Sequence, residues 1–191
     1  MVVLVDMDDT IENLLEAWCK FLNHKYTLDV SPNDITNWNV ASFFPTLTED
    51  EVLEPLRLED FWLTVRPRTD AMKYIQKIHD DGDEVYVVTA SDYRTIKSKF
   101  DNIIKRYFPC ITWDHMIITS KKQMVVGDVL VDDGVHNLEG GCYAKILMTA
   151  PHNKSYDAEA NGMIRVVSWE EAYDAIQNLR LKQGVQRYES Y

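Results

Sequence analysis

The chain has 191 residues, of which 46% are hydrophobic and 11% aromatic, enough for one folded domain or a domain with a modest insertion. This composition excludes wholesale disorder. The 20 lysines and arginines are outnumbered by 31 aspartates and glutamates, and the net charge of −11 argues against binding to duplex nucleic acid or to an anionic membrane.

The cysteines and the apolar runs indicate where the protein works. Cys19, Cys110 and Cys142 are far apart and odd in number, which fits neither a disulfide framework nor a zinc site. The opening apolar run meets Asp6 too early for a signal peptide, and no run approaches the ~18 apolar residues of a membrane span. We therefore expect a soluble, cytoplasmic protein; its oligomeric state is not indicated.

The first third of the chain predicts one strand followed by helices. Val2–Val5 is a β-branched apolar run that is typical of a strand buried on both faces. Apolar residues then recur at helical spacing from Ile11 to about Leu28. A second helical stretch begins near Thr48, whose spacing to Glu51 is that of a capping box. The sequence predicts no strand in this helical part.

After Pro67 strands and helices alternate. The expected helices cover residues 71–82, 92–107 and 168–182, and the expected strands cover residues 84–89, 116–119, 129–131, 144–148 and 164–167. Such alternation predicts an α/β fold, a Rossmann-like parallel sheet with helices on both faces. The predicted core comprises residues 1–11 and 67–182, with a small helical cap of residues 12–66 inserted after the first strand. Residues 183–191 are polar and predicted to be a flexible tail.

Polar residues stand at the ends of several predicted strands, where ligands bind in parallel sheets. They are Asp6, Asp8 and Asp9 after the first strand, Thr89 after the second, Lys121 and Lys122 before the strand at 129, and Asp132 and Asp133 after it. Taken singly, each has an ordinary explanation as a turn, cap or surface residue. Together, four carboxylates repel one another unless a divalent cation neutralises them, and hard oxygen ligands favour Mg²⁺. Mg²⁺ beside a lysine and a hydroxyl is a site for a phosphoryl group.

These motifs resemble, in order and in strand context, the four motifs of the haloacid dehalogenase superfamily of phosphotransferases. The resemblance covers residues 1–11 and about 68–180, and within the superfamily it is closest to the small 5'(3')-deoxyribonucleotidases. Their last two motifs fit the register of Lys122, Val125 and residues 128–133, which favours Lys122 over Lys121. The helical insertion after the first motif resembles their cap.

The resemblance implies a mechanism. Asp6 would attack phosphorus and form an aspartyl-phosphate, and Asp8 would protonate the leaving oxygen and then deprotonate water. Mg²⁺ would be held by the Asp6 carboxylate, the Asp8 backbone carbonyl and Asp132, with Asp133 binding a metal-ligated water. The resemblance further implies that Asp9, Thr89, Ala90 and Lys122 bind the phosphoryl group. Its substrate would be a small phosphate ester, a deoxynucleoside monophosphate.

Aromatic residues of the insertion allow two interpretations. Trp38, Phe43, Phe44, Phe61 and Trp62 form either the core of the cap or a wall that stacks on a base. The resemblance favours substrate contacts by Phe44, Phe61 and Trp62, of which Phe61 and Trp62 resemble an aromatic pair that faces the nucleobase. The five histidines fall at no metal-ligand spacing and are expected to be surface or packing residues.

The chain departs from the family pattern at three places, and alternatives stay open. Asp9 replaces a glycine, Ala90 replaces a second hydroxyl, and Arg68-Thr69-Asp70 replaces Pro-Gly after Pro67. The alternatives are a phosphatase for a sugar phosphate or organic-acid phosphate, and a protein that binds nucleotides without turnover. A two-component receiver domain is disfavoured because in receivers the lysine comes last and no helical insertion follows the first strand.

Overall fold

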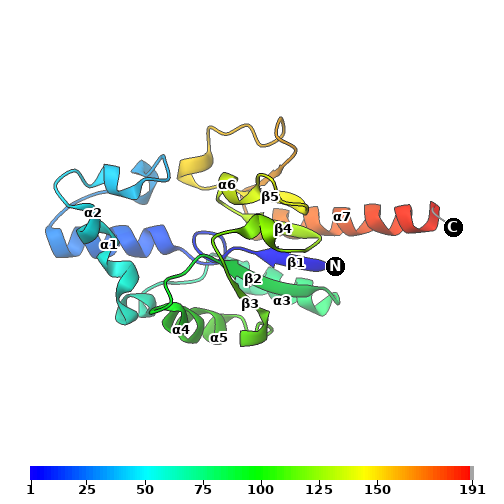
Figure 1. The fold of residues 1–191 in the computed structure, drawn as a ribbon, viewed down its shortest axis with the longest axis horizontal. Coiled ribbons are helices and arrows are strands. Elements are labelled where there is room, and N and C mark those ends of the chain that lie inside the picture. Colours follow the sequence, from blue (N-terminus) through cyan, green and yellow to red (C-terminus); the bar gives the residue numbers. More distant parts are fainter. Residues whose placement is uncertain (190–191) are drawn as a thin grey trace.

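The computed structural model describes the backbone of residues 1–189 and the side chains of residues 1–182. Its centre is a sheet of six parallel strands in the order β3-β2-β1-β4-β5-β6 (Figure 1). The strands are β1 (Val2–Val5), β2 (Glu84–Thr89), β3 (Met116–Ile118), β4 (Val129–Asp132), β5 (Ala144–Met148) and β6 (Ile164–Val166). The predicted α/β fold is confirmed, and each predicted strand is present within one residue of its expected end.

Successive side chains of the central strands face two separate hydrophobic clusters. In β1, Val3 and Val5 belong to one cluster and Leu4 to the other, and all residues of β4 are buried. A strand covered on both faces requires apolar side chains on both. This is why β1 and β4 could be recognised as continuous apolar runs.

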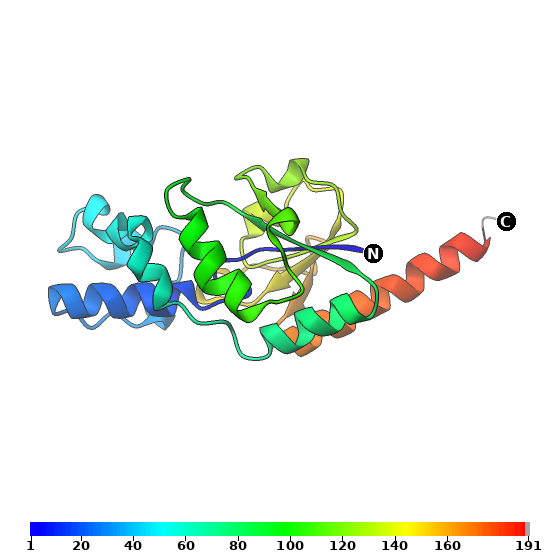
Figure 2. The same ribbon diagram turned by 90° about the horizontal axis from the view of Figure 1, so that it is seen from below.

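Helices cover both faces of the sheet, as predicted. On one face α3 (Ala71–Asp80) and α7 (Trp169–Glu189) pack side by side (Figure 2), and their buried side chains join the same hydrophobic cluster. The short helix α6 (Val135–Leu138) contributes Leu138 to the other cluster. Among the described residues no helix is both long enough and apolar enough to cross a lipid bilayer.

The chain between β2 and β3 is helical but not uniform. It forms α4 (Ile96–Lys99), a π-helical turn (Phe100–Ile104) and α5 (Lys105–Tyr107). The helix begins later than predicted because Asp92 caps a turn, in which its carboxylate accepts a hydrogen bond from the Arg94 amide at 2.8 Å.

Between β1 and α3 the chain forms an all-helical segment, which lies beyond the carboxyl ends of the strands (Figure 1). It comprises α1 (Leu14–Tyr26), α2 (Glu49–Leu53) and 3-10 helices at Pro32–Asp34, Val40–Phe43, Glu54–Arg57 and Glu59–Leu63. The predicted capping box at its second helix is confirmed, since Thr48 and Glu51 exchange hydrogen bonds between side chain and amide. The α-helix ends at Leu53, because Pro55 has no amide hydrogen that could continue the α-helical hydrogen bonds. The chain beyond it forms 3-10 turns.

The two ends of this segment lie next to each other. Glu12 pairs with Pro67 in an antiparallel bridge, and the Arg68 amide donates to the Ile11 carbonyl at 2.9 Å. The chain therefore leaves the sheet region and returns to it at a single place. Further 3-10 turns occur in the loops of the sheet, at Trp113–His115, Lys122–Met124 and Pro151–Asn153.

The last helix is longer than the sequence indicates. Ser168 caps α7 by accepting a hydrogen bond from the Glu171 amide at 3.2 Å, as predicted. The helix was expected to end near Lys182, but it continues to Glu189, so the expected tail of residues 183–191 is helical over most of its length. Residues 190 and 191 lie outside the described residues.

Candidate active site

The candidate site lies where the order of the strands reverses. β1 and β4 are neighbours at the centre of the sheet, and the chain leaves them toward opposite sides of the sheet. Asp6 directly follows β1, its amide donates to the Val131 carbonyl at 2.8 Å, and Asp132 ends β4. A crevice forms at such a reversal point, which is where open parallel sheets bind their ligands.

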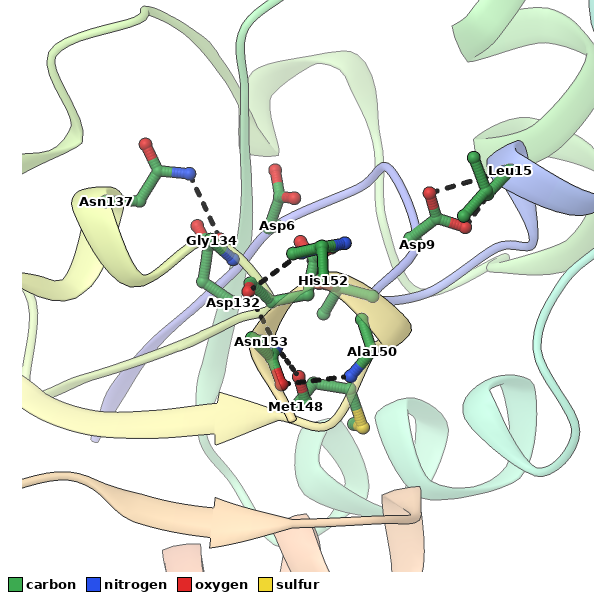
Figure 3. A network of polar contacts seen from close by, with 12 residues as sticks. Asp6, Asp9, Leu15, Asp132, Gly134, Asn137, Met148, Ala150, His152 and Asn153 are labelled. Carbon is green, nitrogen blue, oxygen red and sulfur yellow. Dashed lines mark hydrogen bonds and ion pairs between the residues drawn. The ribbon is translucent and has the colours of Figure 1, made fainter. Parts of the chain in front are cut away.

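Three carboxylates converge at this place, and Figure 3 shows two of them, Asp6 and Asp132. Asp6, Asp132 and Asp133 each offer an oxygen within 4.8 Å of the others, and their residues are 6%, 0% and 2% exposed. The ammonium of Lys122, itself 2% exposed, bonds the Asp6 carboxylate and lies 2.7 Å from an Asp132 oxygen. The structure thus brings together four of the residues that the sequence singled out.

Burial and mutual repulsion dominate the electrostatics of this cluster. Burial raises the pKa of Asp6 well above its usual value, Lys122 lowers it, and the neighbouring aspartates raise it again. The pKa of Asp132 is raised for the same reasons. Burial lowers the pKa of Lys122, but Asp6 and Asp132 outweigh burial and the net shift is upward. The single ammonium of Lys122 therefore neutralises only part of the negative charge that the three carboxylates can carry.

The donor set fits a hard divalent cation. Asp6, Asp132 and Asp133 supply carboxylate oxygens, and Mg²⁺ is bound in proteins by oxygen ligands and water. A bound cation would offset the repulsion that Lys122 leaves uncompensated. The carboxylate of Asp8 is not in this set, so the expected Asp8 ligand is its backbone carbonyl.

Hydrogen bonds from the loops after β4 and β5 hold Asp132 and Asp133. One Asp132 oxygen accepts from the Gly134 amide at 2.7 Å and from the Asn137 amide group at 3.1 Å. A Cβ atom at residue 134 would lie 2.7 Å from the Asn137 side-chain nitrogen, so a larger residue there would displace this hydrogen-bond donor of Asp132. His152 approaches an Asp133 oxygen at 3.1 Å, a contact that the reading of the histidines as surface or packing residues missed.

The Asp8 carboxylate turns to a second buried cation. Lys99 Nζ lies 2.6 and 2.8 Å from the two Asp8 oxygens, and Lys99 is 2% exposed. Sequence reasoning missed this residue. The available signal was its position on a predicted helix, where Ile96 and Ile103 lie three and four residues away and mark the buried face.

Glu12 is a further buried carboxyl near Asp8. It is 0% exposed, and among the described residues neither of its oxygens has a hydrogen-bond partner. Burial raises the pKa of Glu12 well above its usual value, Asp8 and Asp9 raise it further, and Lys99 lowers it. Glu12 therefore belongs to the same charged group as Asp8 and Lys99.

Asp9 adopts the left-handed backbone that a glycine would provide, with φ of 55°. Its carboxylate turns away from Asp6 toward the start of α1, where it accepts a hydrogen bond from the Leu15 amide at 3.0 Å (Figure 3). Burial and Asp133 raise the pKa of Asp9 to about 7, while the Leu15 amide lowers it. The side chain thus caps the start of α1, and the phosphate contact at Asp9 stays a prediction, which its backbone rather than its carboxylate would have to make.

A cleft of about 560 Å³ opens between the cluster and the helical segment. It is lined by Asp6, Asp8, Asp133, Lys122, Ala90, Ser120 and His136 from the core, and by Leu14, Trp18, Ile35, Trp38, Leu53 and Leu56 from the segment. Trp38 is 58% exposed and packs edge-to-face against His136 and His152, with ring centroids 4.5 and 5.0 Å apart. Thr89 lies at the end of β2, fully buried, 3.4 Å from the Ser91 hydroxyl.

The three aromatic residues expected to contact substrate lie in different places. Phe44 and Phe61 are 1% and 2% exposed and belong to the hydrophobic core, and neither lines this cleft. Trp62 lines an adjoining hollow of about 220 Å³ that also contains Asp8 and Lys99. Their substrate contacts remain predictions, and Trp38 is the exposed aromatic residue of the segment that faces the cleft.

Comparison with known proteins identifies the family. The sequence profile of the family described as "5' nucleotidase, deoxy (Pyrimidine), cytosolic type C protein" matches residues 1–183. The chain is 30% identical over 174 residues to a 5'(3')-deoxyribonucleotidase of Bacillus subtilis, covering 89% of this chain and 95% of that protein. It is also 30% identical over 179 residues to a 5'(3')-deoxyribonucleotidase of Clostridium acetobutylicum, covering 92% and 94%.

Solved structures share the fold at low sequence identity. A HAD family hydrolase from Deinococcus radiodurans, with bound phosphate and sodium, has a TM-score of 0.65 at 15% identity and covers 94% of this chain and 96% of its own. A haloacid dehalogenase-like hydrolase from Streptococcus pneumoniae has a TM-score of 0.61 at 11% identity and covers 92% and 97%. The chain therefore belongs to the 5'(3')-deoxyribonucleotidase family of the haloacid dehalogenase superfamily and is a phosphoric monoester hydrolase of the 5'-nucleotidase type.

Proposed function

We propose that the protein hydrolyses deoxynucleoside monophosphates in a Mg²⁺-dependent reaction through a phosphoenzyme on Asp6. The observation that carries the proposal is the buried cluster of Asp6, Asp132 and Asp133 around the ammonium of Lys122, at the reversal point of the sheet. The names of the relatives support the substrate class. The Deinococcus hydrolase, which has the same fold, contains bound phosphate and sodium, and this supports the binding of an anion and a cation by this fold.

Asp6 and Asp8 divide the chemistry in this proposal. An Asp6 oxygen forms a bond to phosphorus while the bond from phosphorus to the ester oxygen breaks, and Asp8 gives its proton to that oxygen. In the second step Asp8 takes a proton from water, whose oxygen bonds phosphorus as the Asp6–phosphorus bond breaks. The Asp6 and Asp132 carboxylates and the Asp8 backbone carbonyl would hold Mg²⁺, with Asp133 as a further carboxylate beside it, and the bound ion would supply positive charge to the phosphoryl oxygens.

The remaining phosphate contacts come from groups that surround Asp6. We assign them to the Thr89 hydroxyl, the Lys122 ammonium and the backbone at Asp9 and Ala90, because backbone amides in a tight loop provide a concave site for anions. Lys122 is paired with Asp6 in the structure. A phosphoryl group in the cleft would share this cation, so Lys122 both binds the substrate and limits repulsion among the carboxylates.

The helical segment of residues 12–66 acts as a cap in this proposal. It closes the cleft opposite the carboxylates, and it places Trp38 across the cleft from the core, against His136 and His152. An exposed indole at the cleft can stack on a nucleobase, because every base has a π-face. Trp62, beside Asp8 in the adjoining hollow, is the second candidate for a contact to the nucleoside. A cytosolic location is supported by the description of the family.

Phosphate release from a panel of esters tests this function. The panel contains deoxynucleoside monophosphates, ribonucleoside monophosphates and sugar phosphates, each with Mg²⁺ or with EDTA. We expect activity to require Mg²⁺ and kcat/KM for the best deoxynucleotide to exceed that for sugar phosphates by about tenfold or more, which corresponds to about 1.4 kcal/mol of binding to the base and sugar. A preference for sugar phosphates, or tight nucleotide binding without phosphate release, would contradict the proposal.

A further inference from the structure

Lys99 is a buried cation for which the proposed chemistry has no use. Lys99 is the last residue of α4 and directly precedes the π-helical turn Phe100–Ile104. Such turns are rare and occur frequently at functional sites. The Lys99 ammonium contacts both carboxylate oxygens of Asp8, at 2.6 and 2.8 Å, and only 2% of the residue is exposed.

An aromatic ring also contacts the Lys99 ammonium. The ammonium lies 4.6 Å from the ring centroid of Trp62, a distance typical of a cation–π contact. Lys99 is therefore held between the Asp8 carboxylate and the Trp62 ring. Glu12 is a fully buried carboxyl close to Asp8, and burial together with Asp8 raises its pKa well above the usual value.

We propose that Lys99 is a positioning residue, which holds the carboxylate of Asp8 in the orientation from which it exchanges a proton with the substrate. The inference rests on the proposed function, because it assigns Lys99 a part in the work of Asp8. A carboxylate has about four acceptor positions, so the two contacts with Lys99 leave others directed elsewhere. Asp8 lines the cleft, and its side chain is 29% exposed.

Two substrates with different leaving groups can distinguish a positioning role of Lys99 from a general loss of structure. When the ester bond of a deoxynucleotide breaks, the departing alkoxide needs the proton of Asp8. When the ester bond of 4-nitrophenyl phosphate breaks, the departing phenolate is stable without a proton. kcat/KM reports the steps up to this first departure, so a displaced Asp8 lowers it for the deoxynucleotide and leaves it nearly unchanged for the nitrophenyl ester.

The experiment compares Lys99→Met with wild type on both substrates in the presence of Mg²⁺. We expect kcat/KM for the deoxynucleotide to fall by about 10- to 100-fold, the cost of a displaced general acid, and kcat/KM for 4-nitrophenyl phosphate to change by less than about threefold. Lys99→Arg keeps the charge and should recover part of the loss. The matched control is Lys97→Met on the same helix, because Lys97 is 87% exposed, pairs only with Asp101 at 2.5 Å among the described contacts, and should leave both values unchanged.

A second variant guards against a simple folding defect. Lys99→Met leaves the Asp8 carboxylate without its cation, so its melting temperature should fall. Adding Asp8→Asn removes this carboxylate and should recover most of the melting temperature. Equal losses on the two substrates, or a melting temperature that Asp8→Asn does not recover, would overturn the inference. A wild-type protein with neither activity would instead overturn the proposed function itself.

Discussion

Arg68 and Asp9, which both depart from the family pattern, meet in the structure: Arg68 Nη1 donates a hydrogen bond to the Asp9 backbone oxygen at 2.8 Å. Asp9 would be unfavourable in a left-handed turn unless it were held there, although aspartate tolerates this conformation better than most residues. The Arg68 contact holds its carbonyl and the Leu15 amide holds its carboxylate. The two departures therefore compensate each other, and the Asp9 carboxylate bonds the start of α1.

The pKa of Asp9 predicts a pH dependence of stability. Burial raises this pKa from 3.8 to about 7, so folding favours the protonated form. The stabilising contribution is complete below the unfolded value near pH 4 and is lost as the pH rises through about 7. Asp9→Asn keeps an acceptor for Leu15 and tolerates the positive φ but carries no charge. In EDTA the melting temperatures of variant and wild type should diverge between pH 5 and pH 8, with the variant more stable at pH 8. A difference in melting temperature between variant and wild type that stays constant over this pH range would contradict the raised pKa of Asp9.

Binding of Mg²⁺ should stabilise the folded protein. The cluster of Asp6, Asp132 and Asp133 exists only in the native state, so at free Mg²⁺ of about 100 times Kd linkage predicts about 2.7 kcal/mol. For a domain near this size each kcal/mol raises the melting temperature by about 2–4 °C, and the expected rise is about 5–11 °C. Asp132→Asn should reduce the rise, because an amide replaces a carboxylate ligand. Thermal scans at constant ionic strength, with a non-coordinating salt as control, measure it. An unchanged melting temperature at saturating Mg²⁺ would contradict the binding of Mg²⁺ by this cluster.

Trp38 should control the preference for nucleotides. Stacking on a base contributes about 1–3 kcal/mol, so Trp38→Ala should raise KM for a deoxynucleotide by about fivefold or more and hardly change hydrolysis of a small generic phosphate ester. Trp113→Ala is the matched control, since Trp113 is 51% exposed and lines neither the cleft nor the adjoining hollow. Equal losses on both substrates would mean that Trp38 only holds the helical segment against His136 and His152.

Lys122 should be essential for the fold as well as for phosphate binding. Removing one partner of a buried ion pair typically costs about 3–5 kcal/mol, because the other charge remains buried without compensation. Lys122→Met leaves Asp6 and Asp132 in this condition, and urea unfolding in EDTA should show a loss of this size. The double variant Lys122→Met/Asp132→Asn should recover part of it. A single variant as stable as wild type would contradict the assigned ion pairs.

The residues that could be predicted from the sequence are those whose position follows from the ends of strands. Asp6 and Asp132 stand at the ends of apolar runs that pair side by side, so a parallel sheet brings them together once the strand order is known. The ends of strands do not indicate Lys99, which reaches the site from a helix: its helical spacing indicates that it is buried, but not that it meets Asp8. The contact of His152 with Asp133 likewise depends on how the loop after β5 packs, which the sequence pattern does not show. Phe44 and Phe61 are predicted to contact substrate, but both lie in the hydrophobic core. Aromatic character alone does not distinguish a core residue from one that lines a cleft.

The ends of helices can likewise be predicted only where the sequence carries a local signal. Pro55 ends α2 for a local reason, the missing amide hydrogen, and such an end can be read from sequence. The extension of α7 to Glu189 has no such local signal. The residues after Lys182 are polar, which is typical of a loose tail, and Gly184 favours an end of the helix rather than its continuation.

The central claim is that Asp6 is the nucleophile of a phosphatase, and Asp6→Asn tests it most directly. The amide has the shape of the carboxylate but is not a usable nucleophile, so the folded variant should lose nearly all Mg²⁺-dependent phosphate release from the best deoxynucleotide. Wild type quenched in acid during turnover should carry phosphate on Asp6, and the variant should carry none. Retention of more than about a tenth of the wild-type rate in pure Asp6→Asn protein would contradict the account, because that rate would require a different nucleophile.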